Sequence, residues 1–386
     1  MTLSKMTLAG ICSCLLVACA SQTSNPSDKS LDQNHGFTDA QVSEAEFWNI
    51  PYPTAFDADS LSKPQALLSV QGNKIVNPAG DTVNLRGVNI ADPAKLDYDD
   101  QWSERLFAEV ADWGANAVRI PIHPMAWRRQ GQDWYFARLD EAVRWANQHE
   151  LYIILDWHLI GNIQANLYQH PMYETTMDET RKFWQQVALR YRGVPTMAVY
   201  ELYNEPTHDF IGNGAESLGK ASWEGLRAIH EELIDLVHVY DQNIIPLVSG
   251  FNWAYDLSFI PDQPVRREGI AYAIHPYPQK AKPAQDTKQD YFDAWQQQWG
   301  FVADSYPVLA TELGWVKEDG YGAHVPVIHN EGTYGPRVVE FMEARDIGWT
   351  AWVFDPDWSP TLINDWDFTP SEQGAFFKKT LTELRD

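Results

Sequence analysis

Two glutamates at the ends of apolar, β-prone segments are the first residues in this chain that could do chemistry. Glu205 ends a run that begins at Ala198 and stops at Pro206, and Glu312 ends a second run that begins at Pro307. Alternating apolar and aromatic residues are typical of strands, and Pro206 cannot continue a strand ladder. Two carboxylates in this setting suit the cleavage of a glycosidic bond, which needs an acid and a second carboxylate. We therefore interpret Glu205 and Glu312 as a glycosidase pair.

Further polar and aromatic residues stand where other predicted strands end. They are Arg119, His158, Asn204, His275, Tyr277 and Trp352. In a barrel of parallel strands, such residues meet at the carboxyl-terminal face, where function is found. This mixture of types at one face indicates a site, because structural needs alone seldom produce it.

Each of these residue types has a use in glycoside cleavage. A cation such as Arg119 holds a nearby carboxylate ionised, whereas crowding by a like charge raises the pKa of the other carboxylate. Asn204 can donate to a sugar hydroxyl, and Trp352 can stack on the apolar face of the sugar ring.

The same residues admit structural interpretations. Arg119 could be a buried ion-pair partner of carboxylates inside a barrel, and a histidine on a strand is often a satisfied core residue. Asn204 could cap a turn, and Tyr277 and Trp352 could be packing. Two further acids on predicted strands, Asp156 and Glu201, are assigned to polar packing inside the barrel and not to the reaction.

Strand and helix patterns alternate along most of the chain. Strands are predicted at 83–90, 116–121, 151–157, 197–204, 244–249, 270–275, 307–312 and 348–354. Helices are predicted at 100–113, 136–149, 178–192, 222–240, 288–304, 334–346 and 372–384. The link 250–269 is irregular, so the fifth helix should be short or missing.

Eight apolar strands separated by helices predict an α/β fold with a closed parallel sheet, the (β/α)8 TIM barrel. Short β runs broken by turn residues at 67–83 predict a small N-terminal β-hairpin cap. An open doubly wound sheet is the alternative, but it requires a glycine-rich phosphate loop after the first strand, and Arg86-Gly-Val-Asn-Ile provides none.

Composition narrows the possible partners. The 386 residues include 44% hydrophobic residues, enough for a large core, and 53 acidic against 29 basic residues give a net charge of −24. This acidity argues against nucleic acid, whose phosphates require a basic surface. Seventeen tryptophans are more than a core requires and favour a surface that stacks on flat ligands.

The N-terminus resembles a bacterial lipoprotein signal. Lys5 precedes the apolar run 6–17, and Leu16-Val17-Ala18-Cys19 resembles a lipobox. We expect residues 1–18 to be the signal peptide, Cys19 to be lipidated, 19–45 to be a flexible polar tether and 46–386 to be the catalytic barrel. The alternative is an ordinary export signal. Ala20 is not the Asp that retains lipoproteins on the inner membrane, so the resemblance implies an outer-membrane lipoprotein, facing the periplasm or the cell surface.

An ordered set of motifs resembles glycoside hydrolase family 5, a cellulase-like family of clan A. The motifs are Leu85-Arg86-Gly87-Val88-Asn89, Val118-Arg119-Ile120-Pro121, Asp156-Trp157-His158, Asn204-Glu205-Pro206, His275-Pro276-Tyr277, Thr311-Glu312-Leu313-Gly314 and Trp352. Asn-Glu-Pro alone is shared with related barrel families, whereas the whole set in this order is specific. The similarity runs from about residue 67 to the C-terminus.

The resemblance implies a (β/α)8 barrel and hydrolysis with retention through a glycosyl-enzyme. Carried over by position, Glu205 is the acid/base and Glu312 the nucleophile, and the other six residues support them. Retention requires carboxyl groups about 5–5.5 Å apart, whereas inversion requires about 6.5–9.5 Å. The family uses no cofactor or metal, and its members bind polysaccharide or oligosaccharide substrates.

The family does not fix the substrate. Internal cleavage of β-1,4-glucan, as cellulose or mixed-linkage glucan, is the first choice, with β-mannanase or exo-β-glucosidase activity as alternatives. Five loop aromatics could be sugar platforms or loop anchors: Trp127, Trp253, Trp315, Trp358 and Trp366.

Two alternative functions belong to other classes of protein. A carbohydrate-binding protein without catalysis is expected to lose a glutamate, and both are present. A metal-dependent hydrolase using His158 and His275 is disfavoured, because the chain has no His-x-His and no His-Glu-x-x-His motif.

Overall fold

A closed barrel of eight parallel strands forms the centre of the computed structural model, which describes residues 52–208, 221–281, 283–316, 324 and 334–385. The strands are β3 (Arg86–Asn89), β4 (Ala117–Ile122), β5 (Tyr152–Trp157), β8 (Met197–Glu201), β10 (Ile245–Ser249), β11 (Ala271–Ile274), β12 (Val308–Leu313) and β13 (Gly348–Ala351). They follow one another around the barrel in chain order, and β13 closes against β3. The predicted fold class and all eight predicted strands are confirmed.

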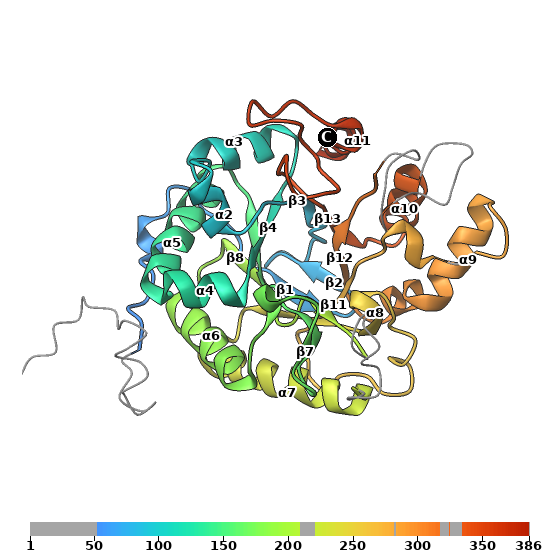
Figure 1. The fold of residues 1–386 in the computed structure, drawn as a ribbon, viewed down its shortest axis with the longest axis horizontal. Helices are drawn as coiled ribbons and strands as arrows, with labels where there is room; N and C mark the ends of the chain where they lie inside the picture. Colours follow the sequence, from blue (N-terminus) through green and yellow to red (C-terminus); the bar gives the residue numbers. More distant parts are fainter. Residues whose placement is uncertain (1–51, 209–220, 282, 317–323, 325–333, 386) are drawn as a thin grey trace, which may run out of the picture. The chain divides into compact units, whose positions relative to one another are not determined.

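Helices lie around this barrel (Figure 1). They are α3 (Glu104–Asp112), α5 (Gln132–Gln148), α6 (Met177–Arg190), α7 (Trp223–Tyr240), α8 (Phe251–Ala254), α9 (Lys288–Gln298), α10 (Tyr334–Glu343) and α11 (Glu372–Arg385). Several begin at a residue that the sequence marks clearly. Thr176, Ser222 and Thr287 each accept a hydrogen bond from a backbone N–H of the first turn, which satisfies a donor that the helix leaves unpaired. The fifth helix, α8, is short, as predicted.

The structure differs from the predicted helices in three places. The helix predicted at 288–304 stops at Gln298, because Trp299 leaves the helical conformation with φ −154° and a 3-10 turn follows at Gly300–Asp304. Two helices were missed, α2 (Pro93–Tyr98) and α4 (Pro124–Gln130). Each has a proline in its first turn, which is a start signal, but six or seven residues are too few to show helical periodicity.

The strand predicted at 197–204 is shorter than expected. The β8 ladder stops at Glu201, and Glu205–Pro206 form a separate short strand, β9, beside β6 (Ile160–Asn162). This small sheet also contains β7 (Leu167–Tyr168), and β9 is its edge strand, where a proline is tolerated. The β6–β9 pairing fixes the backbone of Glu205, whose N–H donates to the Leu159 carbonyl at 3.1 Å.

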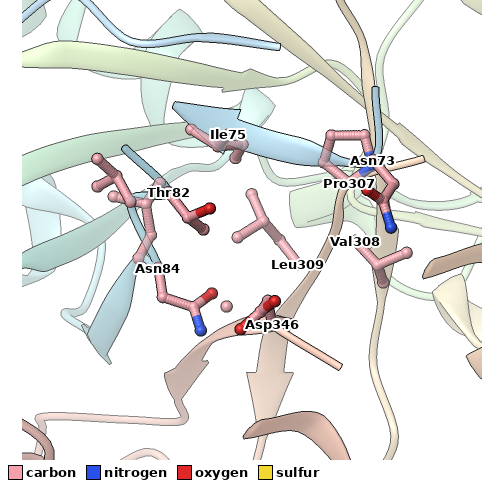
Figure 2. A pocket seen from close by; sticks show the side chains of 11 residues that line it. Asn73, Ile75, Thr82, Asn84, Pro307, Val308, Leu309 and Asp346 are labelled. Atoms are coloured by element: carbon pink, nitrogen blue, oxygen red, sulfur yellow. The ribbon is translucent and has the colours of Figure 1, made fainter. Parts of the chain in front are cut away.

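The amino-terminal end of the barrel is closed by apolar packing. The predicted hairpin is present as β1 (Ser69–Gln71) and β2 (Lys74–Val76). Leu68 and Ile75 pack in one cluster with Leu85, Ile154 and Leu309 from the barrel strands. Figure 2 shows a pocket at this end, between the hairpin and the starts of β12 and β13. Neither Glu205 nor Glu312 lines this pocket.

Charged and polar side chains fill the barrel towards its carboxyl-terminal end. Asn89, Arg119, Asp156 and Glu201 are fully buried there, on β3, β4, β5 and β8 in turn. The barrel therefore has an apolar half that holds the fold together and a polar half that positions a site. No helix among the described residues is long and apolar enough to cross a membrane. The predicted signal peptide, Cys19 and the tether lie outside the described residues.

Candidate active site

The structure brings Glu205 and Glu312 together. A carboxylate oxygen of Glu205, a carboxylate oxygen of Glu312 and a ring nitrogen of His275 all lie within 4.8 Å of one another. The two glutamates are 107 positions apart in sequence but only 7% and 5% exposed. Their carboxylates are thus close enough to act on the two sides of one anomeric centre.

Arg119 is the electrostatic centre of the site. Its guanidinium donates from Nε to Glu201 Oε2 at 2.7 Å and from Nη1 to Glu312 Oε1 at 2.9 Å, and its Nη2 lies 3.0 Å from Asp156 Oδ2. Burial would lower the pKa of Arg119, but the three carboxylates raise it, so the side chain stays charged. Arg119 therefore fits both interpretations of the sequence, because it pairs with carboxylates inside the barrel and also with Glu312.

Glu312 accepts a hydrogen bond on each of its oxygens. Arg119 binds Oε1, and the Tyr277 hydroxyl donates to Oε2 at 3.0 Å. Donors on both oxygens stabilise an anion. The pKa of Glu312 is nevertheless raised, because burial and the neighbouring Glu205 and Glu201 outweigh the lowering by His275 and Arg119.

Glu205 is paired with His275, and a chain of hydrogen bonds fixes the proton between them. The Thr311 hydroxyl donates to Glu201 Oε1 at 2.9 Å, so its oxygen must accept from His275 Nε2, 3.0 Å away. Nε2 therefore carries a hydrogen. His275 Nδ1, which lies 2.8 Å from Glu205 Oε1, then either donates to a Glu205 carboxylate or accepts from a Glu205 carboxylic acid. In both forms one proton lies between Nδ1 and Oε1.

The pKa directions place this proton on the histidine in the free protein. Burial would lower the pKa of His275, but Glu312, Glu201 and Glu205 raise it. Burial would raise the pKa of Glu205, but His275 and Lys280 lower it. The pKa of Glu205 is thus lowered and that of Glu312 raised, which is the reverse of what a protonated acid (Glu205) and an ionised nucleophile (Glu312) require. We assign the roles from the hydrogen bonds, because the His275–Glu205 pair holds a transferable proton whichever partner carries it.

Asn204 presents a free donor to the site. Its Oδ1 accepts from Arg119 Nη2 at 2.7 Å, which orients the amide. Its Nδ2 is buried and has no hydrogen-bond partner within the described part of the chain. A buried donor left unpaired is costly, and a ligand hydroxyl would satisfy it.

Parallel rings line another side of the site. Trp352 stacks on His158, with ring centres 5.7 Å apart and planes inclined by 10°, and on Trp358 at 6.2 Å and 9°. His158 Nδ1 is 2.6 Å from Asp156 Oδ2, which orients its ring. His158 belongs to none of the groups of three or more potential metal ligands among the described residues, so it shares no such site with His275.

The five loop tryptophans divide into anchors and half-exposed rings. Trp127 packs against Trp157 and Phe183, and Trp315 packs against Tyr334, so both belong to the core. Trp253, Trp358 and Trp366 are half-buried, so each ring is partly exposed.

Sequence reasoning missed several residues of the site. Asn89 ends β3 and accepts from Arg119 Nη1 at 2.8 Å; its strand-end position was the available signal. Thr311 precedes Glu312 directly, and its hydrogen bonds to His275 and Glu201 have no sequence signature. Lys280 lies with Nζ 4.0 Å from Glu205 Oε1 and comes from a loop that offered no pattern.

Comparison with known proteins agrees with this geometry. Residues 76–357 match the family described as "Cellulase (glycosyl hydrolase family 5)". "Endoglucanase E-5" of Thermobifida fusca is 24% identical over 306 residues, which cover 75% of this chain and 56% of that protein. An endoglucanase of Paenibacillus polymyxa is 24% identical over 359 residues, 81% of this chain and 86% of that protein. The chain spans about half the length of the first curated relatives it matches.

Among solved structures, the β-glucanase SdGluc5_26A of Saccharophagus degradans in complex with cellotetraose is 55% identical. It superposes with a TM-score of 0.83, covering 89% of this chain and 100% of that one. The catalytic domain of Thermobifida fusca endoglucanase Cel5A, at 22% identity and a TM-score of 0.63, shares the fold.

Replacing Arg119 with methionine should destabilise the protein, and the loss should depend on pH. Without the guanidinium, Asp156 loses its counter-charge, and Glu201 and Glu312 keep only that of His275, at a cost of about 3–5 kcal/mol. Their folded-state pKa values rise above the unfolded values, so the folded state binds more protons and its stability falls as pH rises. Urea unfolding should therefore show a smaller deficit at pH 5 than at pH 7.

The matched control is Arg181→Met. Arg181 is 41% exposed and pairs with Asp178 and Glu232 on the surface, so the change should cost less than about 1 kcal/mol at either pH. An Arg119→Met deficit that is equally small, or that grows as the pH falls, would contradict the role given to Arg119.

Proposed function

Because the chain belongs to glycosyl hydrolase family 5, we propose that this glycoside hydrolase cleaves β-1,4-glucan internally, by double displacement with retention of configuration. The observation that carries the proposal is the approach of Glu205 and Glu312, with oxygens of both within 4.8 Å of one His275 nitrogen and of each other. That spacing favours the short carboxyl separation of retaining enzymes over the wider separation of inverting ones.

In the first step, Glu312 attacks the anomeric carbon. The glycosidic C–O bond breaks, and the leaving oxygen takes the proton held between Glu205 Oε1 and His275 Nδ1. Arg119 and Tyr277 orient the Glu312 carboxylate for this attack, because each hydrogen-bonds a different oxygen. The product is a glycosyl ester of Glu312.

In the second step, water attacks the same carbon from the side that the leaving group has vacated. Glu205, now without the proton, accepts one from the water, and the ester bond to Glu312 breaks. The Asn204 Nδ2 donor suits a hydroxyl of the sugar at the reaction centre, where a hydrogen bond that tightens in the transition state accelerates the reaction.

Support for a glucan substrate comes from the relatives and from the aromatic side of the site. The relatives above are endoglucanases, and the 55% identical β-glucanase was solved with cellotetraose. The ring faces of Trp352 and Trp358 are nearly parallel, which suits the flat, equatorially substituted rings of a β-linked glucan.

The soluble domain without its first 19 residues should hydrolyse carboxymethylcellulose and barley mixed-linkage glucan faster than glucomannan, galactomannan, xyloglucan or laminarin. Glu312→Ala should lower the rate by at least about 10⁴-fold while the protein stays folded, because no ester can form. Reducing-sugar release and circular dichroism check the two statements.

Glu343→Ala provides a control for loss of a glutamate elsewhere. Glu343 binds Arg86 outside the site, so the change should leave the hydrolysis rate nearly unchanged. A preference for galactomannan would replace β-glucan with β-mannan as the substrate. Release of single glucose units from chain ends would contradict internal cleavage.

We also propose that Cys19 carries lipid and anchors the enzyme to the outer membrane. Support comes from the sequence alone: the apolar run 6–17, the small residues before Cys19, and Ala20 after it. Cells fed radioactive palmitate should label the full-length protein, and Cys19→Ser should abolish the label and release the protein from the membrane fraction. Labelling that persists in Cys19→Ser would contradict the anchor.

A further inference from the structure

Lys280 is a buried cation beside Glu205 that the mechanism above does not use. It follows Tyr277 in the 3-10 turn Pro278–Lys280. Its Nζ lies 4.0 Å from Glu205 Oε1, and no ion pair joins it to Glu312 among the described residues. The Lys280 and Glu205 side chains are 8% and 9% exposed, so the two are about equally accessible. Lys280 is thus on the Glu205 side, where the leaving group departs.

Three aromatic rings surround this ammonium. Its Nζ is 6.0 Å from the ring centre of Trp253, 5.9 Å from that of Tyr255 and 5.6 Å from that of Tyr277. Burial lowers the pKa of Lys280 to about 8, although Glu205 and Glu312 act to raise it, so the charge is largely kept at neutral pH. Such a cage holds the cation against the ring faces and leaves its N–H groups for hydrogen-bond acceptors outside the rings.

Only one hydrogen-bond acceptor, the Trp253 carbonyl at 2.7 Å, is found for Lys280 Nζ in the described ranges. An ammonium has three N–H donors. Within the described ranges two of them therefore have no acceptor, and the ammonium lies 4.0 Å from the Glu205 carboxylate, which by the proposed mechanism protonates the leaving oxygen.

The backbone that Lys280 binds is itself unusual. Asn252, Trp253 and Ala254 are consecutive non-glycine residues with φ of 57°, 54° and 54°. Each costs about 1 kcal/mol or more in this left-handed conformation, and such strain persists where surrounding contacts enforce it, often at ligand sites. The Lys280 bond to the Trp253 carbonyl and a bond from Trp253 Nε1 to Gln169 Oε1 at 3.2 Å hold this turn. Its effect is to place a half-exposed indole beside the ammonium.

We propose that Lys280 and Trp253 together bind the sugar on the leaving-group side of the scissile bond. The indole offers a face for the apolar side of that sugar, and the free N–H donors of Lys280 bind its hydroxyls. This inference rests on the proposed function. The same residues also bind an acceptor sugar that takes the place of water in the second step. A hydroxyl of this sugar loses its proton to Glu205, and its oxygen bonds to the anomeric carbon while the ester bond to Glu312 breaks.

The test measures how the glycosyl-enzyme divides between water and sugar. The soluble domain is given β-cellobiosyl fluoride, whose leaving group is not a sugar, together with cellobiose as acceptor. The ratio of transfer product to hydrolysis product is measured for the wild type and for Lys280→Met. Glu205 acts as base in both reactions, so a change in its basicity cancels in the ratio, which reports acceptor binding alone.

Lys280→Met should lower this ratio about 10-fold or more, the effect expected for losing a hydrogen bond from a charged group. Trp253→Ala should also lower it. Lys288→Met is the matched control, because Lys288 on α9 is 51% exposed and pairs with Glu340 on α10; it should leave the ratio unchanged. Fluoride release by each variant confirms that it is folded and active.

The transfer ratio and fluoride release together separate failure of the sugar site from failure of the glycosidase function. An unchanged ratio in Lys280→Met, or no transfer even in the wild type, would overturn the sugar site at Lys280 and Trp253. No fluoride release by the wild type would instead overturn the proposed glycosidase function.

Discussion

A single buried guanidinium, that of Arg119, makes this active site possible. Three carboxylates that face it, on Asp156, Glu201 and Glu312, come from three different strands, and each would be costly to bury alone. Because the barrel brings the carboxyl ends of all its strands to one face, one cation on β4 can reach all three. The fold thus gathers the acids, and Arg119 acts to lower the pKa of each one against the burial that raises it.

The proton needed for catalysis depends on the same network. Arg119 and His275 lower the pKa of Glu201 against the effect of burial, and an ionised Glu201 accepts a hydrogen bond from the Thr311 hydroxyl. Thr311 must then accept from His275 Nε2, which leaves Nδ1 to share its proton with Glu205. A residue outside the reaction therefore sets the tautomer of one inside it, much as a buried acid orients the histidine in other enzymes.

The barrel was predictable from the sequence because parallel strands buried on both faces appear as continuous apolar runs, and eight such runs match eight strands. The eight proposed site residues were predicted by one rule, that polar and aromatic residues at strand ends meet at one face. What escaped prediction has a physical reason in each case. Helix α4 is too short for periodicity, and β9 exists only through pairing with β6, a contact between distant segments. Lys280 is surrounded by rings from α8 and from the segment after β11, and a contact between such separate segments leaves no local sequence pattern.

The central claim is that Glu205 and Glu312 are close enough for double displacement, and the configuration of the first product tests it most directly. The soluble domain would be mixed with cellotetraose, and the anomeric protons followed by NMR before mutarotation equilibrates the new reducing ends. Double displacement predicts that the β anomer appears first and the α anomer grows in later. Initial formation of the α anomer would show inversion by a single displacement and would contradict the nucleophilic role given to Glu312.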